Sequence, residues 1–410
     1  MFVRSTLVAA LASFALGQPQ GPCKILPTDN SWPTQAFVKQ HNIRFVVKGT
    51  GHDYMGRSTG TGAVSVWMHN LKDVTYIPHF QSAHYTGPAF TVQPGVLGFD
   101  VATAAHNKGL VVVGGECTVS FAGGYIQGGG HSALSSYHGL AADQALEFEV
   151  VTTQGELVVA SPTRNQDLYW ALSGGGGGTY AIVWSVTVKA FQDLPVTIAS
   201  INFTSEGISQ NTHWKAIDAY QASTPALTDA KVWGMAQYTA GTFMLNPVFG
   251  VNKSSSEVTA LIQPLLDTLD NLGINYVTAT STYSGYLDAY NTLAFLKDFT
   301  VAADILVGSR LLPRSLWENP VTLKRLQRTI RNILNQRTAA VDVILSPTLK
   351  VAGNPNNAVL PAWRNAERHF TVVISVVDGQ EALDNQDRIT TEFIPELKRL
   401  TPRSGPTIMR

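Results

Sequence analysis

The sequence predicts an α+β protein of two domains, each with its own sheet. At 410 residues the chain is too long for one simple core. Short apolar runs alternate with glycine-rich turns up to about residue 195, and longer helical patterns interspersed with strand-like runs follow. The predicted divisions are a leader of residues 1–17, a first domain of residues 18–195 and a second domain of residues 196–410.

Apolar periodicity and glycine or proline punctuation define the elements of the first domain. Helical spacing predicts helices over residues 35–42, 100–108 and 167–172. Apolar or alternating runs predict strands over residues 43–47, 63–67, 74–77, 90–94, 110–113, 145–152, 156–160 and 182–189. The strands 145–152 and 156–160 are expected to form a hairpin around Gly155.

In the second domain the glycine density falls and the helical segments lengthen. Helices are predicted over residues 213–220, 257–271 and 323–335. Strands are predicted over residues 231–238, 243–251, 274–280 and 370–377. This succession indicates an antiparallel sheet with helices on one face.

Composition and charge limit the classes of partner. The chain has 44% hydrophobic and 14% charged residues, which is ordinary for a packed globular protein. The 29 basic residues balance the 29 acidic ones without a basic run, so nucleic acid is not an expected partner. Arg4, the apolar stretch 7–16 and the small residues before Gln18 are typical of a secretory signal, and no later run is long enough to span a membrane. We therefore expect a secreted protein, in which Asn202 and Asn252 begin glycosylation sequons.

The chain has only two cysteines, Cys23 and Cys117. This count excludes a disulfide framework. One bridge between the two is possible, and the sequence alone does not decide it.

Two glycine-rich stretches are the candidate binding elements. The first, KGTGHDYMGRSTG over residues 48–60, follows a predicted buried strand, and its amide groups can surround an anion such as a pyrophosphate. His52 in its middle can act as a nucleophile or a base. The alternative is a surface turn with an incidental histidine. The second stretch, residues 114–143, allows the backbone to lie against a flat or phosphorylated ligand.

Several common motifs are absent. The glycines do not have the dinucleotide-binding or P-loop spacing, and neither a Gly-x-Ser-x-Gly nor a His-Glu-x-x-His motif occurs. His131 and His138 have no cysteine or carboxylate partners at metal-ligand spacing. Ordinary loop histidines are therefore favoured over metal ligands, and no metal site is predicted.

Four segments in order carry a family resemblance: KGTGHDYMGRS, VVGGEC, GGYIQGGGHSALSSYHGLAADQ and DLYWALSGGGGGTYAIV. Together they resemble the PCMH-type FAD-binding domain of the vanillyl-alcohol oxidase superfamily, and they are most similar to fungal secreted members of the berberine bridge enzyme-like group. The match covers roughly residues 41–190, and a weaker similarity runs over residues 354–366 in the substrate domain.

The resemblance implies an FAD-linked oxidoreductase. Hydride would pass from a small organic substrate (an alcohol, a sugar or a secondary metabolite) to covalently bound FAD, with molecular oxygen restoring the cofactor. In that family the histidine at the position of His52 is bonded to the flavin 8α-methyl carbon, and in doubly attached members the cysteine at the position of Cys117 is bonded to flavin C6. The alternative for Cys117 is a small buried hydrophobe.

The remaining cofactor contacts implied by the resemblance fall into three groups. Those expected around the pyrophosphate are Gly49, Thr50, Gly51, Asp53, Gly56 and Ser58. Those expected along the ribityl and isoalloxazine side are Gly123, Gly128, Gly139, Ala141 and Asp143, and Gly115 is expected to contact the cofactor as part of the Gly115-Glu116-Cys117 segment. Val151 is expected near the adenine end.

The sequence also departs from the family pattern. Family members carry a long additional stretch between the positions of Pro33 and His41, and they continue beyond Gly405 into a tail that often supplies the catalytic base. No base is therefore assigned, and three tyrosines are candidates by residue type alone, with an ordinary core or surface role as the alternative: Tyr238, Tyr283 and Tyr290. Two other functions stay open, a catalytically incomplete flavin scaffold from a shortened gene model and a secreted carbohydrate-binding protein.

Overall fold

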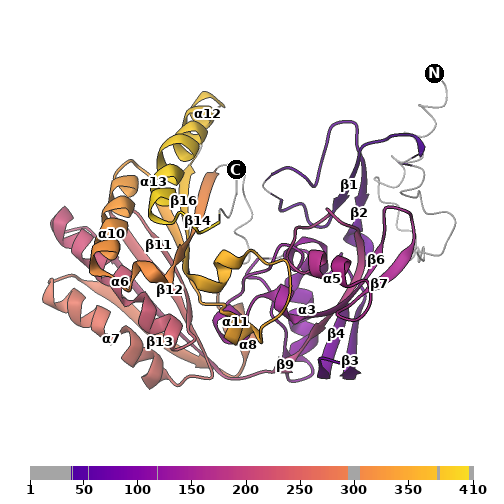
Figure 1. Ribbon diagram of the computed structural model, residues 1–410. Helices are drawn as coiled ribbons and strands as arrows, with labels where there is room; N and C mark the ends of the chain where they lie inside the picture. The colour runs from indigo at the N-terminus through magenta and orange to yellow at the C-terminus, as the bar shows by residue number, and fades with distance from the viewer. Residues whose placement is uncertain are drawn as a thin grey trace.

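The computed structural model describes residue 38 and residues 40–53, 55–117, 119–293, 305–375 and 379–405. The chain forms two halves that lie side by side, with the first half in indigo to magenta and the second in pink to yellow (Figure 1). The predicted leader, Cys23 and most of the predicted helix 35–42 lie outside the described residues.

The first half contains a parallel strand pair and a five-stranded antiparallel sheet. Strand β1 (Phe45–Lys48) pairs in parallel with β2 (Val64–Trp67). The larger sheet has the order β3-β4-β8-β6-β7. Its strands are β3 (Val74–Gln81), β4 (Thr86–Val92), β8 (Ile182–Lys189), β6 (Ala145–Val151) and β7 (Leu157–Ala160). A short pair, β5 (Leu110–Val111) with β9 (Phe191–Gln192), closes this half.

The helices of the first half are short because glycines interrupt them. They are α3 (Gly98–His106), α4 (Ser135–His138) and α5 (Gln166–Leu172). Single turns complete the set: η1 (Met68–Asn70), the π-helical turn η2 (Phe121–Tyr125) and η3 (Ala141–Gln144). Both η2 and η3 lie in the second glycine-rich stretch, and isolated π-helical turns are often found at functional sites.

The second half is built on a seven-stranded antiparallel sheet with the order β13-β10-β12-β11-β15-β16-β14. Its strands are β10 (Val196–Thr204), β11 (Trp233–Tyr238), β12 (Thr242–Val251), β13 (Tyr276–Tyr283), β14 (Ile305–Pro313), β15 (Ala339–Ile344) and β16 (Ala366–Ser375).

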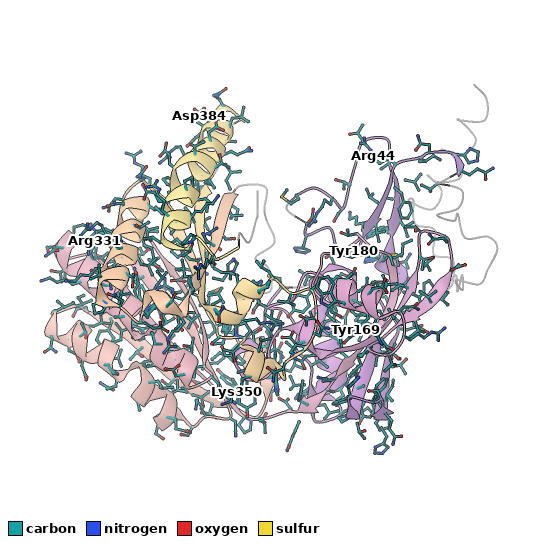
Figure 2. The ribbon with its side chains drawn as sticks, viewed as in Figure 1. Arg44, Tyr169, Tyr180, Arg331, Lys350 and Asp384 are labelled. Carbon is teal, nitrogen blue, oxygen red and sulfur yellow. The ribbon has the colours of Figure 1, made fainter. Side chains whose placement is uncertain are left out.

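Helices cover the outer face of this sheet (Figure 1). The long ones are α6 (Gln210–Asp229), α7 (Ser255–Asn271) and α10 (Pro320–Leu334), followed near the chain end by α12 (Gly379–Arg388), η7 (Ile389–Phe393) and α13 (Ile394–Leu400). Figure 2 shows Arg331 of α10 on this outer side. The remaining elements are α8 (Tyr286–Asn291), η5 (Arg314–Leu316), α11 (Leu349–Ala352) and η6 (Pro361–Asn365). None of the helices described is long and apolar enough to cross a membrane.

Among the described residues, two large apolar cores result from this layering, and Met68, Val151 and Ile182 form a third, small one. One lies between the outer helices and the second sheet. The other is continuous from the first half to the inner face of the second sheet, where Met235, Leu311 and Val343 pack against first-half residues such as Phe121 and Leu140. We call this inner contact the seam. Burial of these apolar side chains away from water stabilises the contact between the two halves.

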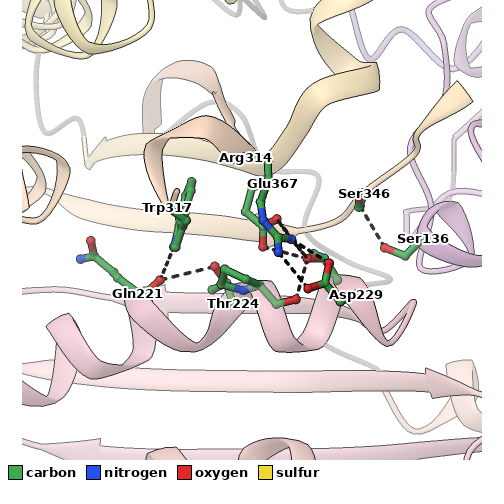
Figure 3. A network of polar contacts seen from close by, with 10 residues as sticks. Ser136, Gln221, Thr224, Asp229, Arg314, Trp317, Ser346 and Glu367 are labelled. Carbon is green, nitrogen blue, oxygen red and sulfur yellow. Dashed lines mark hydrogen bonds and ion pairs between the residues drawn. The ribbon is translucent and has the colours of Figure 1, made fainter. Parts of the chain in front are cut away.

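Ion pairs link neighbouring strands of the second sheet to each other and to α6. Figure 3 shows Arg314 between Asp229 of α6 and Glu367 of β16, with oxygen–nitrogen distances of 2.8 and 3.0 Å. Burial raises the pKa of Glu367 to about 7, although Arg314 and Thr228 oppose this shift. A second pair, Arg368 with Asp342, is fully buried.

The predicted fold class, α+β with an antiparallel second sheet covered by helices, is confirmed by the structure. The strand predicted over residues 182–189 has the predicted bounds, and the hairpin of β6 and β7 forms around Gly155. The strand predicted over residues 110–113 is shorter, since only Leu110 and Val111 find a partner. Strands β10, β14 and β15 and helix α8 were not predicted from the sequence.

Candidate functional site

The histidine loop leaves the end of β1 and is held in shape by contacts of its own. Gly51 and Gly56 have positive φ values of 95° and 73°, which favour glycine. The indole nitrogen of Trp67 donates to the carbonyl of Gly49 at 3.0 Å. Arg57 donates from its backbone and side chain to Asp53, at 2.7 and 2.5 Å. Asp53 therefore shapes the loop.

His52 is exposed on this loop. Partial burial by the loop lowers the pKa of its ring below the usual histidine value. At neutral pH the ring is therefore uncharged, with one nitrogen carrying a lone pair. Ser58, further along the loop, is half-buried.

The structure brings the histidine loop against the second glycine-rich stretch at Ser120. The amide of Ser120 donates to the hydroxyl of Thr50 at 3.2 Å. A Cβ atom at Gly49 would lie 2.8 Å from the Cβ of Ser120, so only glycine allows this approach. Ser120 lies three residues after Cys117, so the segments that carry His52 and Cys117 are neighbours. The position of each site residue relative to FAD stays a prediction.

Cys117 is half-buried and is not bridged to any described residue. Burial, and then the charge of Glu116, raise the pKa of the Cys117 thiol to about 11. The phenol of Tyr290 donates to the backbone carbonyl of Glu116 at 2.6 Å and anchors this segment to α8. In the chain as described, the thiol is therefore protonated at neutral pH.

The glycines of the two stretches differ in the space around the position that a Cβ atom would take. Gly115, Gly123 and Gly139 are needed for internal packing, because an added Cβ would lie 2.9 Å or less from Tyr125, Ser120 and Ala352 respectively. An added Cβ at Gly56, Gly124 or Gly129 would meet no described heavy atom within 4 Å. An added Cβ at Gly128 would be 3.2 Å from the carbonyl of Gly124. The open positions leave room for a ligand along the backbone.

Buried polar atoms without a hydrogen-bond partner also cluster at the second glycine-rich stretch. Among the described residues of the first half, four buried side-chain atoms have no hydrogen-bond partner: Glu116 Oε1, Gln127 Oε1, His131 Nδ1 and Ser173 Oγ. All four lie in the second glycine-rich stretch or next to the five-glycine run. Because a buried polar atom without a partner costs about 1–3 kcal/mol, this clustering fits a polar ligand such as FAD.

Asp143 has a structural role in addition to its predicted one. Its buried carboxylate accepts from Arg364 at 2.7 and 2.8 Å, from Asn357 at 2.8 Å and from the amide of Leu140 at 2.8 Å. Arg364 and Asn357 belong to the second half, so the pair crosses the seam. Its contact with the cofactor stays a prediction.

The neighbours of Asp143 are also packed within the protein. Ala141 is buried against Gly130, and Val151 is buried beside Met68 and Ile182. In Figure 2, Lys350 shows the position of α11, a second-half helix that lies between the two halves.

The three candidate tyrosines are in different surroundings. Tyr238 is fully buried on the helix side of the second sheet and donates to Asp342 at 3.0 Å. Tyr283 is half-buried beside the seam core. Tyr290 lies next to Glu116, where burial, Cys117 and Glu116 raise its pKa. Within the described residues, no group of three or more histidine, cysteine or acidic side chains could hold a metal ion.

One cluster at the seam was missed by sequence reasoning. Nδ1 of His131 lies 3.6 Å from Oε2 of Glu116. The rings of His131, Trp363 and His369 form a triangle with centroid separations of 5.5 to 5.9 Å. These residues come from separate segments, and no spacing in the sequence links them.

A groove of about 700 Å³ runs along the second sheet. Gln237 pairs with Val341 and lines this groove. Two residues away along β11, on the same sheet face, Met235 pairs with Val343, and Val343 pairs with His369 of β16. These three residues are buried in the seam. Part of the groove lining, Gln237 and Val341, thus lies on the same sheet face as the seam, one pleat repeat beyond His369, while Tyr238 and Phe203 of the helix-side core line the rest.

The chain is similar to known FAD-dependent proteins. A family model described as an FAD binding domain matches residues 34–161. The FAD-linked oxidoreductase patO of Aspergillus clavatus is 43% identical over 378 residues, which are 91% of this chain and 65% of that protein. This chain thus spans less than two thirds of that relative's length.

Solved structures show the same fold. The crystal structure of the VAO-type flavoprotein MtVAO615 from Myceliophthora thermophila has a TM-score of 0.84 at 35% identity, covering 91% of this chain and 69% of that chain. The structure of a glucooligosaccharide oxidase from Acremonium strictum, which carries a 6-S-cysteinyl, 8α-N1-histidyl FAD, has a TM-score of 0.71 at 18% identity, covering 91% and 78%. The second likeness shows the fold alone.

Proposed function

The chain belongs to the VAO-type family of FAD-linked oxidoreductases, and we propose that it oxidises a small organic hydroxyl compound with FAD bound at the seam. The proposal rests most directly on the meeting of the His52 loop with the Cys117 segment at Ser120. The open backbone at Gly56, Gly124 and Gly129 supports it, because a ligand can lie there without displacing side chains.

We further propose that His52 holds FAD covalently and that Cys117 adds a second bond. His52 suits this role because its lowered pKa keeps the ring neutral and nucleophilic at neutral pH. Cys117 must lose its proton before it can bond, since only the thiolate is a good nucleophile. Bound FAD would supply hydride acceptance and, with molecular oxygen, its own reoxidation.

The protein residues would bind, orient and exclude water. Amides of the His52 loop would donate to the pyrophosphate, with Arg57 and Asp53 fixing the loop. Gln127 would hold the second stretch, because its amide nitrogen donates to the carbonyls of Ala122 and Gly123 at 3.0 and 2.9 Å. The seam core around Phe121 and Leu311 would exclude water from the reacting side.

The groove on the second sheet is the proposed substrate approach. Val341 and Val373 line it together with Gln237, so it offers an apolar wall with a polar amide group. An alcohol, a sugar or a secondary metabolite fits this description. Secretion, with a glycan on exposed Asn252, is part of the same proposal.

An absorption spectrum followed by anaerobic substrate addition tests this function. The purified 410-residue chain should show the two visible and near-ultraviolet absorption bands of oxidised flavin. At least one member of a panel of primary alcohols and oligosaccharides should bleach the longer band, and air should restore it. A protein without flavin bands would contradict the binding proposal. Bound flavin that no substrate reduces would indicate a scaffold without turnover.

A further inference from the structure

We propose that Glu116 and His131 form a carboxylate–imidazole base at the seam, which takes the hydroxyl proton of the substrate in the proposed oxidation. The inference rests on the proposed function and assigns the base that the sequence left open. As the substrate C–H and O–H bonds break, His131 would take up the hydroxyl proton, bound FAD would accept the hydride with its electron pair, and a carbonyl product would form.

The first support is the geometry of the pair. Nδ1 of His131 faces Oε2 of Glu116 at 3.6 Å, beyond hydrogen-bond length but within ion-pair range. Nδ1 itself is buried, whereas about 31% of the His131 side chain is exposed. Part of the side chain other than Nδ1 is therefore open to solvent. A base oriented from behind by a carboxylate is the arrangement that catalytic histidines use.

The backbone of residues 129–131 is tightly constrained next to the seam. Gly129 and Gly130, directly before it, have positive φ values of 106° and 70°. A Cβ at Gly130 would lie 2.8 Å from Ala141 and 2.9 Å from Tyr125, so no larger residue fits. The phenol of Tyr125 donates to the carbonyl of His131 at 2.8 Å. These three constraints fix the backbone from which the His131 side chain projects.

The third support is the location. Glu116 directly precedes Cys117, the proposed attachment point at flavin C6, and in the flavin ring C6 is separated by one carbon from N5, which accepts hydride. His369, from β16, completes the cluster and lies one row from the groove. Proposed cofactor edge, base and substrate path therefore converge at the seam.

Among the described titratable groups that face His131, Glu116 is the one that raises its pKa. Burial disfavours the charged ring, but the Glu116 carboxylate outweighs it, and the pKa of His131 is raised. Burial and the nearby His131 lower the pKa of His369 to about 3, so His369 stays neutral. The other titratable groups facing the cluster are the thiol of Cys117 and the phenols of Tyr125, Tyr286 and Tyr290, which burial keeps protonated at neutral pH. Glu116 is thus the charged partner that His131 meets.

The chain offers a matched control. His106 and Asp193 form another histidine–carboxylate pair at the same 3.6 Å, with side-chain exposures of 37% and 11% against 31% and 12% for His131 and Glu116. His106 lies on α3, and neither residue belongs to the proposed site. His106→Gln and Asp193→Asn therefore test whether an effect is specific to the seam pair.

Two measurements on the full-length, flavin-loaded chain decide the proposal. In the first, the rate of anaerobic flavin reduction by benzyl alcohol and by cellobiose is followed against pH. Wild type and His106→Gln should share a rate that rises with pH through the pKa of His131. Glu116→Gln should move this rise to lower pH, and His131→Gln should reduce the rate about 10²–10⁴-fold. A rate for His131→Gln within threefold of wild type overturns the proposal.

The second measurement does not require turnover. The chain is labelled with ¹³Cε1-histidine, the His131 signal is assigned by its loss in His131→Gln, and the signal is titrated by NMR. His131 should titrate above pH 6.5 in wild type, at a lower pH in Glu116→Gln, and at the wild-type pH in Asp193→Asn. A His131 pKa that is at or below 6.5 and does not change in Glu116→Gln would contradict the proposed interaction between His131 and Glu116. If neither probe reduces wild-type flavin, the proposed function fails for these substrates, and the titration alone decides the pair.

Discussion

Residues around the proposed attachment points differ in how ready they are to react. His52 is neutral and exposed, whereas the thiol of Cys117 is half-buried beside a carboxylate. The sequence placed both residues on glycine-rich segments, and the structure adds that their segments touch through Thr50 and Ser120. The first bond is therefore expected to form more easily than the second.

Alkylation of Cys117 tests its surroundings. Because its pKa is raised to about 11, only about one thiol in a thousand is ionised at pH 8. In flavin-free protein the rate of reaction with iodoacetamide should rise about tenfold per pH unit from pH 7 to 10. The Cys117→Ser variant gives the background rate of Cys23. A plateau below pH 9 would show that burial and Glu116 do not hold the proton.

Glu367 predicts a pH dependence of stability. Its pKa of about 7 exceeds the usual value of 4.5, so between these pH values the folded state holds a proton that the unfolded chain has released. The contribution of Glu367 to the free energy of unfolding should therefore fall, by on the order of 2–3 kcal/mol, as pH rises from 4.5 to 7. Urea unfolding of wild type and Glu367→Gln over this range checks it. An equal slope in both proteins would contradict the raised pKa.

Elements governed by local pattern were predictable. Strand β8 alternates cleanly, and the β6–β7 hairpin is marked by Gly155. Strands β14 and β15 were missed because buried charges interrupt them. Arg310 in β14 donates to Thr401 and Ser404, and Asp342 in β15 pairs with Arg368. Those partners are remote in sequence, so the pattern looked too polar for a core strand.

The same limit applies to the site. The glycines that allow φ values above zero could be recognised, but their neighbours could not. Gly139 and Gly174 pack against Ala352 and Val359 of the second half, so part of the glycine content serves docking between the halves. His131 was assessed from nearby residues alone, and Glu116 and His369 reach it only through the fold.

Gly174 gives an element-level prediction. An added Cβ would lie 2.6 Å from Cγ2 of Val359 and 2.8 Å from its backbone nitrogen, at a φ of 104°. Gly174→Ala should cost about 1–2 kcal/mol for the backbone and a further 1–3 kcal/mol for overpacking. Gly155→Ala is the control, because Gly155 has a φ of 85° with no described atom within 4 Å of the added Cβ. Equal losses of unfolding free energy in the two variants would contradict a docking role.

At the scale of the whole molecule, the seam joins two sheets into one unit. Its apolar core runs through both halves, and Asp143 with Arg364, at 2.7 Å, is one of the polar contacts that cross it. The proposed cofactor, base and groove all lie along this seam. Stability of the seam and function of the site are therefore coupled.

Arg364→Met tests that coupling. The variant leaves the Asp143 carboxylate buried without its charged partner, which should cost about 3–5 kcal/mol. Arg331→Met removes a pair of similar length, 2.8 Å, with both side chains about a third exposed, and should cost at most about 1 kcal/mol. Urea unfolding at pH 7 measures both. A loss for Arg364→Met as small as that for Arg331→Met would mean that the pair does not hold the seam.

The central claim is that FAD is tethered to this chain at His52. Acid precipitation of the purified protein, followed by mass spectrometry of its tryptic peptides, measures this directly. The pellet of wild type should stay yellow, and the peptide containing His52 should carry the mass of the flavin, while His52→Ala should lose that mass. A colourless wild-type pellet, with all flavin in the supernatant, would contradict the claim.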